Sequence, residues 1–184
     1  MSMQLDKVQP KNRIQLEQLI GYAFKHNIYD LNFIDTSKIT NMSNLFANCE
    51  YNIDVSNWDV SNVTNMYNMF YCCKNFDCDL SNWNVSNVTD MYSMFIACEN
   101  FKGKGLENWD VSNVKDIGSM FAGCENFNCD LSNWDMSNVT DMGYAFIDCE
   151  KFKGKGLENW NVLNVTNMKC MFDGCNKLTI PNWY

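Results

Sequence analysis

Apolar residues follow two different spacings within each unit of the chain. From Trp83 to Val85 they alternate with polar residues, which is typical of a short strand with one buried face. From Met91 to Cys98 they fall at positions i, i+3, i+4 and i+7, which is typical of one face of a short helix. The polar residues 86–90 between them favour a turn and a helix cap, because Ser, Asn and Asp side chains bond to free backbone N–H groups. Each unit is therefore predicted to run strand, turn, short helix and return.

This pattern repeats with a period that alternates between 25 and 26 residues. The phrase Trp58-Asp-Val-Ser-Asn-Val-Thr-Asn-Met66 returns four more times, and its last echo is the truncated Pro181-Asn-Trp183. A fixed period of this size predicts a stacked array in which each unit packs mainly against its neighbours. The predicted fold is an α/β, leucine-rich-repeat-like, right-handed solenoid. Short parallel strands would form one face and short helical turns the other.

The chain is predicted to divide into a cap and an array. Residues 1–33 differ from the repeats and are expected to form an N-terminal cap, with a helix at about residues 12–27 that Asn12 can cap. Such a cap would shield the edge of the first coil. Residues 34–184 are expected to form about six coils of 25 or 26 residues, the last of them truncated.

Two residue types recur once per unit and are predicted to stack as buried columns. The tryptophans are Trp58, Trp83, Trp109, Trp134 and Trp160, and the cysteines are Cys49, Cys73, Cys98, Cys124, Cys149 and Cys175. A reduced cysteine packs as a small hydrophobic residue. We favour packed free thiols over disulfides between neighbouring coils, because a disulfide requires a specific geometry.

Charge and hydropathy narrow the function classes. The formal net charge is -8, which argues against nucleic-acid binding and against docking on an anionic membrane surface. No stretch is long and apolar enough to insert into a membrane, and no secretory signal is recognisable at the N-terminus. The missing signal and the expected free thiols indicate a cytoplasmic protein.

The residues of common catalytic and metal sites are scarce. The only histidine is His26, in the cap, so no Ser or Cys elsewhere has an obvious histidine partner. The cysteines lack the paired spacing of a zinc site, and no phosphate-binding glycine loop occurs. We therefore predict no catalytic residues, no metal site and no cofactor. A hydrolase with a carboxylate pair is the least favoured hypothesis.

The repeated phrase from Trp58 to Met66, with the following Met-Phe-x-x-Cys and Phe, resembles a known family. It is similar to the repeat of the BspA-like leucine-rich-repeat surface proteins of bacteria, and to a Mycoplasma-type repeat of unknown function. The similarity covers about residues 28–183. It implies a leucine-rich-repeat-like solenoid with a binding role, which in some members is adhesion to host proteins or to other bacteria. It therefore suggests a surface or secreted location.

The sheet side of such an array is its usual binding surface. We therefore predict that the protein binds a protein or a glycan without catalysis. The alternative is an intracellular scaffold or an exported effector. The end coils could also pair into a homodimer. The candidate binding residues flank the tryptophans: Asn57, Asp59, Asn82, Asn84, Asn108, Asp110, Asn133, Asp135, Asn159 and Asn161. A merely solvated face is the competing interpretation.

A second candidate feature is a segment that occurs twice. Lys102-Gly-Lys104-Gly-Leu-Glu-Asn recurs from Lys153 through Lys155, so four lysines are expected to gather on one edge of the array. A small anion site is one interpretation, and a loop duplicated together with its coil is the one we favour.

Overall fold

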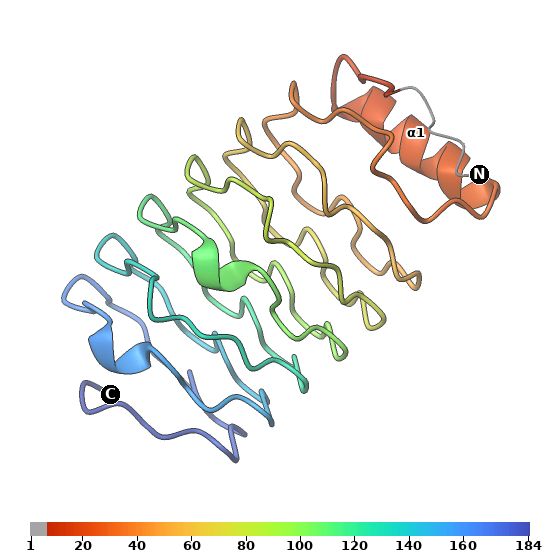
Figure 1. Ribbon diagram of the computed structural model, residues 1–184. Coiled ribbons are helices and arrows are strands. Elements are labelled where there is room, and N and C mark those ends of the chain that lie inside the picture. Colours follow the sequence, from red (N-terminus) through yellow and green to blue (C-terminus); the bar gives the residue numbers. More distant parts are fainter. Residues whose placement is uncertain (1–6) are drawn as a thin grey trace.

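The computed structural model describes residues 7–184 as a stack of coils, with α1 at one end and the C-terminal residues at the other (Figure 1). Isolated parallel bridges join the coils, and one series of them runs through the positions Asn41, Asn65, Asp90, Asp116, Asp141 and Asn167. Each bridge links a residue to its equivalent one repeat later. The repeat period therefore equals the length of one coil, whereas a right-handed, leucine-rich-repeat-like solenoid stays a prediction.

The N-terminal end of the stack holds α1 (Arg13–Lys25), inside the range where the sequence predicts a helix. The side chain of Asn12 accepts a hydrogen bond from the backbone N–H of Gln15 at 3.0 Å, which satisfies a free donor of the first turn. Leu16, Ile20 and Ala23 are buried against the first coil. The helix covers that end of the core (Figure 1).

Two short 3-10 helices mark the longer coils. They are η1 (Leu106–Asn108) and η2 (Leu157–Asn159), and they lie two coils apart on the same edge of the stack (Figure 1). Each follows a glycine with positive φ, Gly105 at 96° and Gly156 at 94°. The extra residue of each 26-residue coil is accommodated in these turns.

The strand predicted at Trp83–Val85 is absent, and this prediction is wrong. The Asn84 side chain accepts a hydrogen bond from the N–H of Ser86 at 3.1 Å, and the N–H of Val88 donates to the carbonyl of Val85 at 2.8 Å. These local hydrogen bonds compete with strand pairing and bend the chain directly after Val85. The parallel bridges lie farther along the coil, at the position of Asp90.

The helix predicted from Met91 to Cys98 is also wrong, because these residues form consecutive turns. The N–H of Met94 donates to the carbonyl of Met91, and Ser93 and Ala97 have positive φ. Every second N–H of the segment instead reaches a carbonyl of the following coil: Met91 donates to Asp116, Ser93 to Gly118, Phe95 to Met120 and Ala97 to Ala122, at 2.7–3.1 Å. Hydrogen bonding between coils thus replaces the i to i−4 bonds of a helix.

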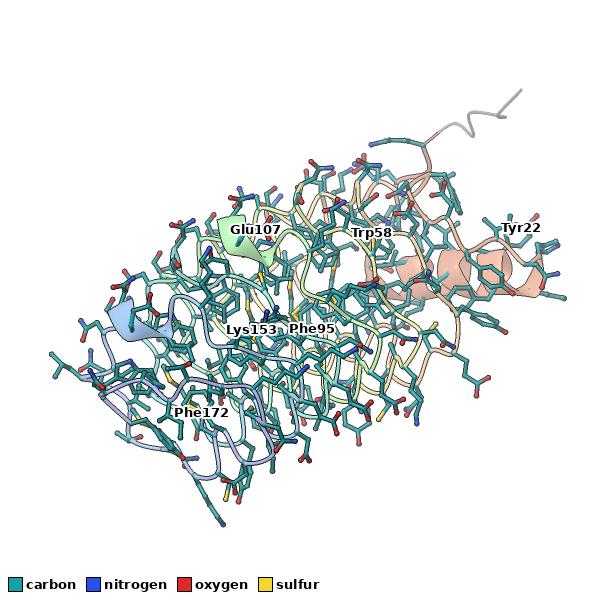
Figure 2. All side chains as sticks on the ribbon, turned by 60° about the horizontal axis from the view of Figure 1, so that its bottom comes forward. Tyr22, Trp58, Phe95, Glu107, Lys153 and Phe172 are labelled. Carbon is teal, nitrogen blue, oxygen red and sulfur yellow. The ribbon has the colours of Figure 1, made fainter. Side chains whose placement is uncertain are left out.

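The tryptophans lie inside the stack and tie neighbouring coils together. All five have exposed fractions of 5% or less. Each indole N–H donates to a backbone carbonyl of the preceding coil, at distances from 2.8 to 3.3 Å. The rings of Trp83 and Trp109 stack with centroids 6.2 Å apart. A column of stacked phenylalanines runs through the same interior, and Figure 2 labels Trp58 and Phe95 as members of the two columns.

The cysteine column also bonds to the backbone of the preceding coil. The thiols of Cys73, Cys98, Cys124, Cys149 and Cys175 each donate to the carbonyl of a phenylalanine in the preceding coil, with sulfur–oxygen distances of 2.9–3.0 Å. All ten cysteines are free. Burial raises the pKa of Cys73 to about 12, so its thiol keeps its proton and remains a donor at neutral pH.

One column of the stack places like charges side by side. Asp90, Asp116 and Asp141 occupy consecutive positions of the bridge series, and burial together with the carboxylates of Asp141 and Asp90 raises the pKa of Asp116. Asn65 and Asn167 flank the three aspartates and donate to Asp90 and Asp141. Asp116, in the middle, has a carboxylate on both sides.

We expect Asp116→Asn to raise the free energy of unfolding by about 0.5–1 kcal/mol at neutral pH, because like charges directly opposite each other destabilise a pairing. The amide oxygen retains the bond that the N–H of Gly118 makes to Asp116 at 2.8 Å. Since the pKa of Asp116 is raised in the folded state, its penalty is full above that pKa and vanishes as the group is protonated in acid. Thermal unfolding at neutral and acidic pH measures both effects.

Asp135→Asn is the matched control for this prediction. Hydrogen bonds from Ser137 lower the pKa of Asp135, so its ionised form favours the folded state. Its replacement should leave the thermal midpoint unchanged or lower it slightly. A rise as large as that of Asp116→Asn would show that only net charge matters and would contradict the local explanation.

Candidate functional site

The ten candidate binding residues form two exposed rows beside the buried tryptophans. The amide row consists of Asn57, Asn82, Asn108, Asn133 and Asn159, and the Asp/Asn row of Asp59, Asn84, Asp110, Asp135 and Asn161. Every member of both rows is exposed. Because each tryptophan side chain points into the core, its two neighbours in sequence are directed to solvent. The coils therefore repeat a pair of polar side chains along the stack.

The Asp/Asn row is held by short-range hydrogen bonds. Oδ1 of Asp59 accepts from the backbone N–H of Ser61 at 3.0 Å and from its hydroxyl at 2.6 Å, and Asp110 accepts in the same way from Ser112. Oδ1 of Asp135 accepts from the N–H of Ser137 at 2.9 Å. In these bonds only Oδ1 is used, so each carboxylate has a fixed orientation and a second oxygen available to a donor.

The amide row takes part in contacts between coils. The side-chain amide of Asn82 donates to Oδ1 of Asn57 at 3.3 Å, and that of Asn133 donates to the carbonyl of Glu107 at 3.1 Å. The structure thus brings the predicted residues to one side of the stack but gives them different roles. The amide row is partly structural, and the Asp/Asn row carries the acceptors and the negative charge.

The lysines of the duplicated segment are mostly paired. Lys102 forms an ion pair with Asp77, Lys104 with Asp79 at 2.6 Å and Lys155 with Asp130 at 2.6 Å. Sequence analysis did not single out Lys151 and Lys177, which line a groove together with Lys102 and Lys153. The repeat register could have identified these two lysines, because each directly precedes the residue that occupies the inward-facing Phe position of its coil.

His26 lies at the C-terminal end of α1, where its Nδ1 is 2.8 Å from the carbonyl of Tyr22 and its ring packs on that tyrosine. Within residues 7–184, no group of three or more His, Cys, Asp or Glu side chains is placed to hold a metal ion. The helices of the same range are too short or too polar to cross a membrane. The amide row and the Asp/Asn row can therefore interact with a partner through hydrogen bonds and charge.

Comparison with known proteins places the chain in a family. The model of the family described as "Mycoplasma protein of unknown function, DUF285" matches twice in tandem, over residues 14–105 and 93–183. No curated protein and no solved structure matches the chain. The two matches together span nearly all of the array. The chain therefore belongs to the family of Mycoplasma proteins of unknown function, DUF285.

Proposed function

We propose that this protein is a noncatalytic binding module whose Asp/Asn row recognises a protein or a glycan rich in hydrogen-bond donors. The observation that carries the proposal is the fixed orientation of the row's side-chain oxygens, through bonds such as that from Ser61 to Asp59. A side chain that is already ordered loses less conformational entropy when a partner binds. The row is therefore prepared for recognition before any ligand arrives.

The regular spacing of the row supports the same proposal. Equivalent side chains recur from Asp59 to Asn161 over four coil-to-coil steps, which correspond to roughly 19 Å at the usual spacing of paired backbones. A partner with repeated donors could contact several coils at once. Several weak contacts of this kind add up to high avidity.

A more specific version of the proposal is adhesion at a bacterial surface. It rests on the resemblance of the repeat to BspA-like surface proteins. An intracellular scaffold is the second candidate. It is favoured by the ten free cysteines, because free thiols persist in reducing compartments. Both forms use the same row and differ only in the partner and its location.

The test uses a printed glycan array and a panel of immobilised extracellular-matrix proteins as probes. We expect the wild-type protein to bind at least one of them without converting it. The triple variant Asp59→Lys, Asp110→Lys and Asp135→Lys should weaken that binding by about tenfold or more, because each change removes an acceptor oxygen and places an ammonium group against the donors of the partner. Surface plasmon resonance gives the affinities.

The control variant makes the same change in net charge at another row. Glu50, Glu125 and Glu150 are exposed and follow the cysteine column, so their reversal to Lys leaves the Asp/Asn row intact. Equal loss of binding in both triple variants would assign the effect to net charge and contradict the proposed site. Turnover of a bound glycan that disappears with one carboxylate would contradict a noncatalytic role.

A further inference from the structure

A basic groove crosses the C-terminal half of the stack. It has a volume of about 410 Å³ and is lined by Lys102, Asn126, Asn128, Lys151, Lys153 and Lys177. These residues come from four successive coils, so the groove runs along the axis of the array and not around one coil. No carboxylate and no apolar side chain lines it. In a chain of net charge -8, such a local concentration of lysines needs an explanation.

Three of the four lysines of the groove have no carboxylate partner, whereas the fourth, Lys102, is paired with Asp77. Lys74, Lys104 and Lys155 each form an ion pair with a carboxylate of a neighbouring coil. Within residues 7–184, Lys151, Lys153 and Lys177 form no ion pair, although all three are exposed. Their charge is therefore available to a ligand.

One residue difference between the coils that precede the two copies of the duplicated segment leaves the charge of Lys153 unpaired. The backbone N–H of Lys102 donates to the side chain of Asp77 in the preceding coil, and the ammonium group of Lys102 pairs with the same carboxylate. The N–H of Lys153 donates in the same way to Oδ1 of Asn128, at 3.1 Å. An amide in place of the carboxylate keeps the backbone contact but leaves the ammonium group of Lys153 (marked in Figure 2) without a counter-charge.

We propose that this groove binds an acidic glycan, an extended sugar chain with sulfate or carboxylate groups. A ligand lying along the groove would meet the ammonium groups of Lys151, Lys153 and Lys177, which come from two successive coils. Lysine is a suitable partner for such oxyanions as a mobile point charge. This site is separate from the Asp/Asn row and goes beyond the proposed function of that row.

The lining favours a glycan over the other polyanions. Nucleic acids bound as single strands stack their bases on aromatic side chains, and the lining contains none. Acidic peptides usually anchor an apolar side chain in a pocket, and no aliphatic or aromatic residue lines this groove. The side-chain amide of Asn128 carries donors that suit sugar hydroxyls.

The test titrates the full chain with a heparin octasaccharide by isothermal calorimetry at low salt. We expect binding that weakens as salt rises, because ion pairs with exposed lysines are screened. Lys153→Ala should lower the affinity about fivefold, and Asn128→Asp should do the same, since one lysine near an anionic surface accounts for about that factor. Asn128→Asp is informative because it recreates the Asp77–Lys102 arrangement without removing any lysine.

Lys155→Ala is the matched control. It changes the net charge by the same single unit, and its lysine is already paired with Asp130, so its affinity should stay within about twofold of the wild type. Three results would overturn the proposal: no binding of the octasaccharide, equal losses in Asn128→Asp and Lys155→Ala, or equally tight binding of polyglutamate or of a single-stranded DNA oligonucleotide. The last result would indicate a nonspecific polyanion surface.

Discussion

Trp109→Ala is expected to lower the free energy of unfolding by about 3–5 kcal/mol, the usual range for removing a large aromatic side chain from a core. Trp109 is 2% exposed, and its ring stacks on that of Trp83. Its indole N–H donates to the carbonyl of Leu80 at 3.3 Å, a bond that alanine cannot make. Urea unfolding followed by circular dichroism measures the change.

Trp183→Ala provides the control at the end of the stack. Trp183 is only partly buried and lies in the last, truncated coil, where its ring stacks on that of Trp160 with centroids 6.2 Å apart. Its loss should therefore destabilise the fold much less. Equal losses at Trp109 and Trp183, or an unchanged midpoint in Trp109→Ala, would contradict a core whose stability depends on contacts with coils on both sides.

Part of the fold can be predicted from the spacing of the repeated residues. The period, the inward direction of the tryptophans and the position of α1 follow from spacing alone, because a residue that must be buried recurs at the same point of every coil. The backbone path between Met91 and Cys98 does not follow from spacing. Apolar residues at i, i+3, i+4 and i+7 face the core in a helix, and they also face it in consecutive turns that bond to the next coil.

The residue types mark only part of these turns, for example through Asn44, Asn68 and Gly123. Positive φ usually signals Gly or Asn. In this chain Cys72, Ser93, Ala97 and Tyr144 adopt it, and none of these residue types favours that conformation. Bonds between coils impose it, for example from the N–H of Cys72 to the carbonyl of Ile96 at 2.8 Å. A local pattern cannot show a conformation that the neighbouring coil determines.

The candidate sites divide in the same way. The Asp/Asn row is visible in the sequence, since its members immediately follow the tryptophans. The basic groove is not visible, because it depends on which residues face each other one coil apart. Lys102 and Lys153 stand in identical segments, and only the register with Asp77 and Asn128 shows that one is paired and the other is not.

Gly105→Ala is expected to lower the free energy of unfolding by about 3 kcal/mol, from the strain of positive φ in a non-glycine residue and from overpacking. Gly105 has a φ of 96°, and a Cβ at this position would lie 2.2 Å from the backbone nitrogen of Ser81 and 2.5 Å from the carbonyl carbon of Leu80. Both atoms belong to the backbone of the preceding coil, so no side-chain rotation relieves the contact.

The same substitution at Gly21 should have the opposite sign. Gly21 lies within α1, where an added Cβ would meet no atom within 4 Å, so alanine should raise the free energy of unfolding by about 0.5–1 kcal/mol through its higher helix propensity. Gly156→Ala, in the second copy of the turn, should match Gly105→Ala, because its Cβ would lie 2.2 Å from the nitrogen of Ser132. Thermal unfolding compares the three variants. If Gly105→Ala were as stable as the wild type, the close approach of the η1 turn to the preceding coil would be wrong, and with it the register that places Lys104 beside Asp79.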